Sequence, residues 1–191
     1  MLVDHEYHVK DIMQDLNAAP PNTHPTIVNS FDIPISRRAF SSMAGGKYLN
    51  DDIINWTLAW WRSQIGGGQN NNKTITPQVH PDLPRCYYVN THWFTKLQVA
   101  GVTERLLKWT NKANLDRDYD LMLIPVNILE HHWHLAVIDF KNKRIATHDS
   151  YEPKRTRNTI APAKPETYST LITWLTKHHG ETYKSRFPTE E

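Results

Sequence analysis

Three extended segments in the second half of the chain constrain its fold most strongly. Apolar residues dominate positions 121–125 and 133–139, and a third extended segment follows at 144–149. Near-continuous apolar runs of this length are typical of strands that are covered on both faces of a sheet. The residues between the second and third segments, Lys-Asn-Lys at 141–143, are only long enough for a hairpin turn. The sequence therefore predicts three strands with helices on both faces of their sheet.

Helices are predicted on either side of these strands in the sequence. Asn50 is a natural N-cap, and two acidic residues follow it in the first turn, where the helix dipole favours them. Apolar residues then recur at helical spacing and predict a buried stripe made of Ile54, Leu58, Trp61 and Ile65. Further helices are predicted at residues 36–43, 91–97, 102–109 and 168–179, with Ser36 and Thr91 as the N-caps of the first two.

The composition bounds the class of protein. The chain has 191 residues, 39% hydrophobic and 22% charged, which suits one soluble globular domain. A net charge of +2 gives no footprint for nucleic acid or an anionic membrane, so neither is predicted as a partner. We find no secretory signal and no apolar run long enough for a membrane span. A single cysteine, Cys86, leaves no internal disulfide and fits a reducing, intracellular compartment.

Three polar segments are expected outside the packed core. Residues 1–34 are expected to form an N-terminal leader, partly disordered, because their prolines favour an extended connection. The glycines and asparagines of residues 66–73 predict a flexible surface insertion. The basic run Lys-Arg-Thr-Arg at 154–157 is interpreted as part of a solvated loop rather than as a binding site for an acidic partner.

The densest group of chemically useful residues is His-His-Trp-His at 131–134, which faces His148 and Asp149 across the predicted hairpin. A histidine beside a carboxylate is the general-base half of a catalytic triad. Side chains alternate along a strand, so His132 and His134 share one face. If the turn centres on residues 141 and 142, Asp149 lies on that face too, but a slip of one residue reverses this. The spacing alone does not choose the histidine.

Other interpretations of the same residues stay open at this point. The histidines and Asp149 can be polar residues at strand ends, each satisfied by one hydrogen bond. His132, His134 and Asp149 can also be read as three zinc ligands, but the chain has no cysteine partners and no helical His-Glu-x-x-His pattern, so no metal site is predicted. Cys86 lies within an expected strand and is interpreted as a small buried hydrophobic residue rather than a nucleophile.

Five short motifs occur in one order along the chain. They are Tyr-Leu-Asn-Asp at 48–51, Asn-Thr-His-Trp-Phe at 90–94, Ile-Pro-Val-Asn at 124–127, His-Trp at 132–133 and Asp-Ser at 149–150. In this order and spacing, the region from about residue 35 to residue 179 resembles the catalytic domain of the ubiquitin-like-protein-specific cysteine proteases. These enzymes remove SUMO and related modifiers from proteins.

The resemblance implies a fold, a reaction and roles for named residues. It implies an α+β, papain-like cysteine proteinase fold, with a central, mostly antiparallel sheet flanked by helices. His132, which precedes Trp, matches the catalytic base, and Asp149 matches the carboxylate that orients it. Trp133 and Tyr48 match two aromatic residues that sandwich the diglycine tail of the substrate, although the family has Trp where this chain has Tyr48. Asp51 matches an acidic residue that meets the modifier, or serves only as a favourable helix charge.

The same resemblance implies a partner and a location. SUMO or another ubiquitin-like protein would be the substrate, no cofactor would be needed, and the location would be the nucleus or cytoplasm.

The C-terminal part departs from the family pattern. The family's nucleophilic Cys and oxyanion-hole Gln follow the helix matched at 168–179, and neither occurs in residues 180–191. We therefore expect residues 35–191 to resemble the catalytic domain without its C-terminal part, and the chain alone to be inactive. The alternative is a binding module that docks the modifier without cleaving it.

Overall fold

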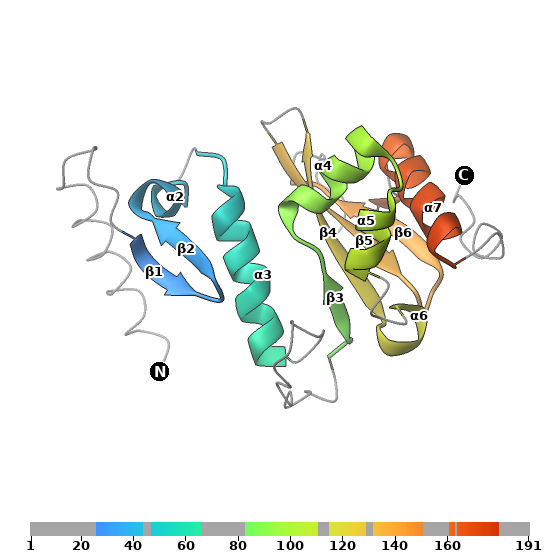
Figure 1. Ribbon diagram of the computed structural model, residues 1–191, viewed down its shortest axis with the longest axis horizontal. Coiled ribbons are helices and arrows are strands. Elements are labelled where there is room, and N and C mark those ends of the chain that lie inside the picture. The colour runs from blue at the N-terminus through green and yellow to red at the C-terminus, as the bar shows by residue number, and fades with distance from the viewer. Residues whose placement is uncertain are drawn as a thin grey trace. The chain divides into compact units, whose positions relative to one another are not determined.

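The computed structural model describes residues 26–43, 47–65, 83–110, 115–128, 132–150, 161–162 and 164–179. The chain divides into two compact units, residues 1–57 and residues 58–191 (Figure 1). The predicted insertion at 66–73, the basic run at 154–157 and residues 180–191 lie outside the described residues, as does most of the expected leader. The domain boundary expected at residue 35 stays a prediction. Within the described part, none of the helices has the length and apolar character that a bilayer crossing requires.

The first unit is built around a tight hairpin that the sequence did not predict. Strand β1 (Thr26–Ser30) pairs antiparallel with β2 (Ile33–Ser36), and both turn residues, Phe31 and Asp32, have positive φ angles of 61° and 59°. Two positive φ angles give a turn whose twist matches that of paired strands. Helix α2 (Arg37–Ser41) follows at once, and Ser36 caps it by accepting a hydrogen bond from the Ala39 backbone N–H at 3.1 Å, as predicted.

Helix α3 (Asp51–Ile65) begins as the sequence predicts but buries a different face. The Asn50 side chain accepts a hydrogen bond from the Asp52 backbone N–H at 2.8 Å. Among the α3 side chains that the structure describes, which exclude Ile65, the buried one is Ile53. Ile53 belongs to a small cluster with Ile35 and Ala39, whereas Trp61 is 46% exposed. The predicted stripe through Trp61 is therefore wrong, because the spacing of apolar residues on this helix also fits a face through Ile53, and that face meets β2 and α2.

The second unit contains a five-stranded sheet that confirms the predicted α+β architecture. The sheet order follows the chain, with β3 parallel to β4 and every later pair antiparallel. Its strands are β3 (Cys86–Tyr88), β4 (Leu121–Ile128), β5 (His132–Asp139), β6 (Arg144–His148) and β7 (Ala161–Pro162). Its helices are α4 (Thr91–Ala100), α5 (Glu104–Thr110), α6 (Leu115–Asp118) and α7 (Pro165–His179). Asn90, not Thr91, occupies the N-cap position of α4, so that detail of the prediction is wrong.

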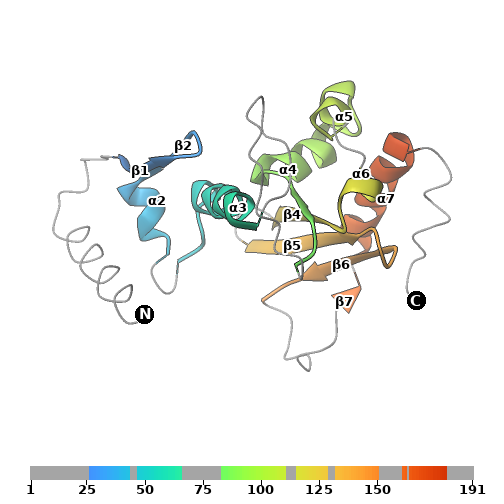
Figure 2. The ribbon, with the colours of Figure 1, turned by 90° about the horizontal axis from the view of Figure 1, so that it is seen from below.

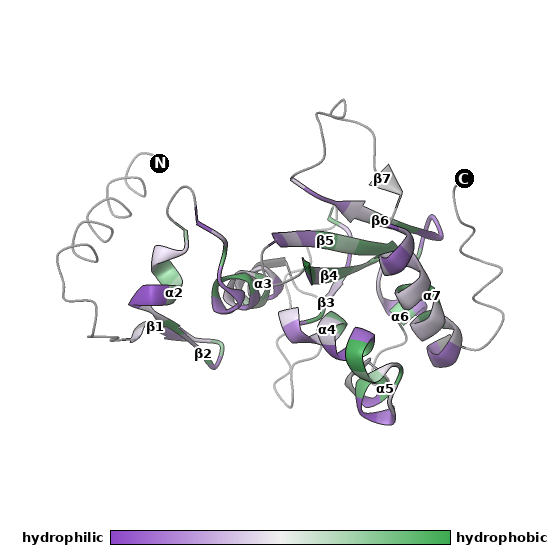
Figure 3. Cartoon of the chain, turned by 90° about the horizontal axis from the view of Figure 1, so that it is seen from above, coloured by the Kyte–Doolittle hydropathy of each residue, from purple (hydrophilic) through white to green (hydrophobic). Residues whose placement is uncertain are grey.

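The main core lies between one face of this sheet and helices α4 and α7. Alternate residues of β4 and β5, such as Met122, Ile124 and Ile138, are fully buried there. Trp93 of α4 meets Trp174 of α7 edge to face, with ring centroids 5.0 Å apart. Figures 2 and 3 show both helices on the same side of the strands.

The other face of the sheet is covered less than the sequence predicted. Leu121, Leu123 and Leu135 project from that face and are only half-buried, although Val137 and Ala146 beside them are buried. This face is therefore only partly buried within the described residues, and helices on both faces of the sheet stay a prediction. The runs at 121–125 and 133–139 are continuously apolar in sequence because the residues that project from this partly buried face are also apolar.

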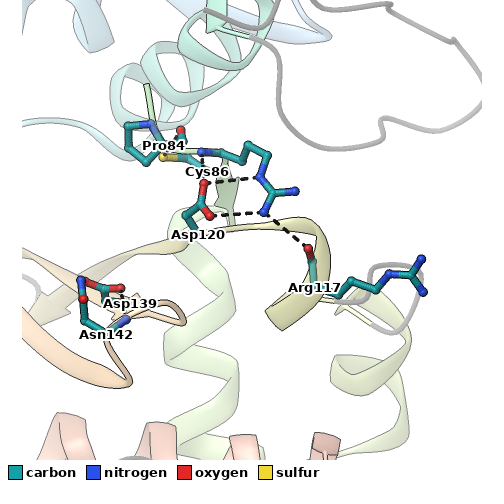
Figure 4. Close-up of polar contacts among 7 residues, drawn as sticks. Pro84, Cys86, Arg117, Asp120, Asp139 and Asn142 are labelled. Atoms are coloured by element: carbon teal, nitrogen blue, oxygen red, sulfur yellow. Dashed lines mark hydrogen bonds and ion pairs between the residues drawn. The ribbon is translucent and has the colours of Figure 1, made fainter. Parts of the chain in front are cut away.

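The hairpin between β5 and β6 has the register that places Asp149 on the histidine face. Asp139 pairs with Arg144 and Leu135 with His148, so the turn centres on residues 141 and 142. The Asp139 carboxylate fixes this turn by accepting hydrogen bonds from the Asn142 backbone N–H at 2.9 Å and from its side-chain amide at 2.8 Å (Figure 4). Of the two registers that the sequence allowed, the structure has the one that brings Asp149 and His132 to one face.

A second polar contact joins the entries of β3 and β4. The Asp120 carboxylate accepts hydrogen bonds from the Arg85 backbone N–H at 2.9 Å and from its guanidinium at 3.2 Å. That guanidinium also donates to the Arg117 carbonyl at 3.4 Å (Figure 4). The hydrogen bonds from Arg85 hold the pKa of Asp120 below its usual value of 3.8. The contact therefore favours the folded state while the carboxylate is charged.

Replacing Asp120 by Asn should lower the free energy of unfolding at pH 7 by about 1 kcal/mol, because a half-exposed ion pair contributes little beyond its backbone hydrogen bond. The folded-state pKa is depressed, so this stabilisation is present above pH 3.8 and is lost as the pH falls through the folded-state value. Urea titrations of both proteins at neutral and acidic pH measure the difference. The exposed Asp116→Asn change is the control, and equal stabilities of wild type and Asp120→Asn at pH 7 would contradict the prediction.

Candidate active site

His132 and Asp149 form a direct hydrogen-bonded pair at one end of the β5–β6 hairpin. His132 is the first residue of β5, and Asp149 directly follows β6. The His132 Nε2 atom lies 2.5 Å from Asp149 Oδ1. The register makes the two residues diagonal neighbours on one face, which is within reach of a long polar side chain. This end of β5 is hydrophilic, whereas the rest of the strand is hydrophobic (Figure 3).

The two partners differ in their access to solvent. The Asp149 side chain is 2% exposed, and that of His132 is 19% exposed. A buried carboxylate orients the ring, while a partly accessible imidazole can meet a substrate. The carboxylate and the base of a catalytic triad differ in the same way.

His134 shares the same face but is not suited to act as the base. Leu135 pairs with His148, so the next position of the register sets His134 opposite Asp149. The Asp149 side chain nevertheless forms its hydrogen bond with His132. His134 is 4% exposed, and neither of its ring nitrogens has a hydrogen-bond partner among the described residues. Burial, reinforced by the charge of Lys164, lowers the pKa of His134 to about 4. His134 is therefore a neutral, inaccessible ring at neutral pH.

Lys164 is a member of the site that the sequence did not reveal. Its Nζ atom donates to Asp149 Oδ2 at 2.5 Å, so the two carboxylate oxygens have different partners. Lys164 directly precedes α7, and in the sequence it closes a polar, basic segment that gave no hint of a specific contact. Only the tertiary fold, which sets the start of α7 beside the end of β6, brings the two residues together.

The arrangement can take up a proton at a defined atom. If Asp149 is ionised, it only accepts hydrogen bonds, and the ring nitrogen that faces it, Nε2, carries the hydrogen. The base is then Nδ1, the other ring nitrogen. When the ring becomes an imidazolium, the negative charge of Asp149 stabilises it.

Cys86 does not lie where it could react with this base. It pairs with Leu121 at one end of β4, whereas His132 pairs with Ile128 at the other. Seven strand residues separate these positions, roughly 23 Å at the usual rise. The thiol is buried at 6% exposure, its Sγ lies 3.4 Å from the Pro84 carbonyl oxygen, and burial raises its pKa. The prediction that Cys86 is a buried hydrophobic residue is confirmed.

The remaining predicted site residues lie in separate parts of the structure. Trp133 is half-buried and points to the face of β5 opposite His132. Tyr48 is 58% exposed and precedes α3 in the first unit, where Asp51 is the first helical residue. The aromatic clamp and the contact of Asp51 with a modifier stay predictions. As for zinc, no group of three or more metal-ligating side chains occurs in the part of the chain that the structure describes.

Comparison with known proteins identifies the relatives of this chain. Residues 47–190 match the family described as the Ulp1 protease family, C-terminal catalytic domain. A Sentrin-specific protease of Caenorhabditis elegans is 30% identical over 129 residues, 68% of this chain and 16% of that protein. Ubiquitin-like-specific protease 1 of Saccharomyces cerevisiae is 25% identical over 146 residues, 76% of this chain and 20% of that protein. The chain thus spans less than a quarter of these relatives.

Solved structures share its fold. The X-ray structure of the C-terminal Ulp1 protease domain in complex with Smt3, the yeast ortholog of SUMO, aligns with a TM-score of 0.64 and 20% identity, over 91% of this chain and 69% of that one. The SUMO protease Ulp1 with its catalytic cysteine oxidised to a sulfonic acid aligns with a TM-score of 0.61 and 20% identity, over 96% of this chain and 70% of that one. At this identity the likeness establishes the fold, which confirms the predicted fold class.

Replacing His134 by Leu should flatten the pH dependence of stability between pH 6.5 and pH 4. The unfolded chain binds a proton near pH 6.5, whereas folded His134 resists it until about pH 4, so stability present above pH 6.5 is lost as the pH falls. At about 1.4 kcal/mol per pKa unit, the wild type loses about 3 kcal/mol through this group. Urea titrations from pH 7 to pH 4 measure the slopes. Exposed His92→Leu is the control, and parallel curves for wild type and His134→Leu would refute the assignment.

Proposed function

This chain belongs to the Ulp1 protease family, and from that membership we propose that it carries the base and carboxylate of a cysteine-type peptidase or isopeptidase. The observation that supports this most directly is the His132–Asp149 pair at 2.5 Å, with a buried acid and an accessible ring. His132 would take the proton of an attacking thiol at Nδ1, and Asp149 would hold the ring and stabilise its charged form.

The proposed substrate is SUMO or a related ubiquitin-like modifier, cleaved after its C-terminal diglycine. The names of the relatives and the Smt3 complex of the Ulp1 domain support this class. Tyr48 and Trp133 are proposed to sandwich the diglycine, because only residues without side chains pass between two aromatic rings. Asp51 is proposed to meet the basic surface of the modifier. Such a reaction needs no cofactor, and we place it inside the cell, in the nucleus or cytoplasm.

The nucleophile of this reaction is not Cys86, and Cys86 is the only cysteine among the 191 residues. Hydrolysis through an acyl-enzyme requires a thiol beside Nδ1 of His132. We therefore propose that the 191-residue chain, taken alone, does not cleave its substrate.

Incubation of the chain with SUMO that carries a C-terminal electrophile should yield no covalent adduct, because the single thiol is buried and lies at the far end of β4 from His132. Intact-mass spectrometry measures the adduct directly. The Cys86→Ala variant is the matched control. An adduct that forms with the wild-type chain and disappears with Cys86→Ala would show that Cys86 is the nucleophile and that the proposed site is wrong.

A non-catalytic role as a modifier-binding module is the second candidate. It is favoured by the exposure of Tyr48 and Leu49, at 58% and 46%, beside an acidic helix start. Large apolar side chains that stay exposed next to charges are typical of binding surfaces.

Titration calorimetry with SUMO tests this candidate. Binding should be detected, and Tyr48→Ala or Trp133→Ala should weaken it by about tenfold or more, as expected when an aromatic anchor is lost. Val99→Ala, a change at an 84% exposed position of α4, should leave the affinity unchanged. A wild-type chain that is folded by circular dichroism but gives no heat with SUMO would exclude the binding module.

A further inference from the structure

We propose that Lys164 is a positioning residue of this site, which keeps Asp149 ionised and thereby fixes the hydrogen of the His132 ring on Nε2. The proposal rests on the proposed function in that it concerns the same base. Two hydrogen bonds support it: Oδ1 of Asp149 is bonded to the His132 ring, and Oδ2 accepts from the Lys164 ammonium.

Asp149 is buried deeply enough to need a cationic partner. Its side chain is 2% exposed, and removal of a carboxylate from water favours the neutral, protonated acid unless a positive charge or several hydrogen bonds compensate. The Lys164 ammonium, 2.5 Å from Oδ2, supplies both a charge and a hydrogen bond. A neutral histidine supplies only the hydrogen bond at Oδ1. Of these two partners, Lys164 is thus the one that favours the anion.

The protonation state of Asp149 decides which nitrogen of His132 is the base. An ionised Asp149 accepts the hydrogen of Nε2 and leaves the lone pair on Nδ1. A protonated Asp149 can donate to Nε2 instead, and the ring then carries its hydrogen on Nδ1. A ring of that second form has no lone pair on Nδ1 to accept the proton of a thiol. The ammonium of Lys164 therefore acts on the reaction through Asp149, without touching the reacting atoms.

Helix α7, which begins at the next residue, holds Lys164 in this position. The Lys164 carbonyl accepts a hydrogen bond from the Tyr168 backbone N–H at 2.8 Å in the first turn of α7. Helix α7 is anchored by Leu171 and Trp174, both fully buried. Asp149 and His132 are set by the hairpin register, so three elements converge on one carboxylate. Neighbouring His134 faces the same charges, and Lys164 contributes to the depression of its pKa.

Nitrogen-15 spectra of the imidazole rings test the proposal, because they distinguish a hydrogen on Nε2 from one on Nδ1. We compare the wild-type chain with Lys164→Met and Lys164→Arg at pH 8, where an ordinary imidazole is neutral. The wild type and Lys164→Arg should show His132 with its hydrogen on Nε2. Lys164→Met should show a second population with the hydrogen on Nδ1, and the pKa of His134 should rise. Lys177→Met, an exposed change on the same helix, should match the wild type.

A purely structural ion pair would behave differently. Lys164→Met would then melt at a lower temperature and keep the wild-type His132 signals, which overturns the proposal. The proposal is also overturned if Lys164→Arg resembles Lys164→Met, because the charge would then not be what matters. If Lys164→Met does not fold, Lys164→Gln replaces it in the test. Its neutral amide donates a hydrogen bond without a charge, so it should show the same second His132 population with the hydrogen on Nδ1. These spectra need neither a modifier nor a thiol, so they stand even if SUMO binding and cleavage are both excluded.

Discussion

The register of the β5–β6 hairpin is the constraint on which the rest of the site depends. Side chains alternate between sheet faces, so a slip of one residue would move Asp149 to the face opposite His132. The Asp139 carboxylate fixes the turn by accepting two hydrogen bonds from Asn142. Lys143 completes the turn with a φ angle of 52°, a conformation that a non-glycine residue adopts only when its neighbours require it. The His132–Asp149 pair is thus aligned by contacts at the far end of its hairpin.

Burial along this one face then assigns different roles to chemically similar groups. His132 lies at the end of β5 and keeps contact with solvent, whereas His134, two residues further in, is buried and neutral. The Asp149 side chain is 2% exposed, and both of its oxygens have partners, His132 at Oδ1 and Lys164 at Oδ2. The proposed base and the neutral ring therefore differ in burial and not in residue type. The burial of Asp149 makes the ammonium of Lys164, which is itself 38% exposed, more effective than it would be in water.

The sequence predicted those features that depend on local pattern. Asn50 and Ser36 were identified as helix caps because capping needs only neighbouring backbone groups, and the three central strands followed from their apolar runs. The register was reduced to two alternatives, and the family resemblance chose His132 over His134, in agreement with the hydrogen bond to Asp149. The packing face of α3 was predicted wrongly, because two apolar faces compete on that helix and only contact with Ile35 and Ala39 selects one. Lys164 was missed because its contact with Asp149 depends on how the start of α7 lies beside the end of β6, which no local pattern in the sequence records.

The proposed acid–base half of the site comes from one hairpin and from the residue that precedes helix α7. His132, Asp149 and Lys164 are positioned by β5, β6 and α7, all of which pack on a core that they share with α4. Neither of the two contacts, His132–Asp149 and Asp149–Lys164, involves a thiol. On the proposed function, the orientation of the His132 ring is set before any nucleophile approaches, as expected of a site that is preorganised rather than assembled by its substrate. A thiol at Nδ1 would then meet a ring that the fold already holds against Asp149.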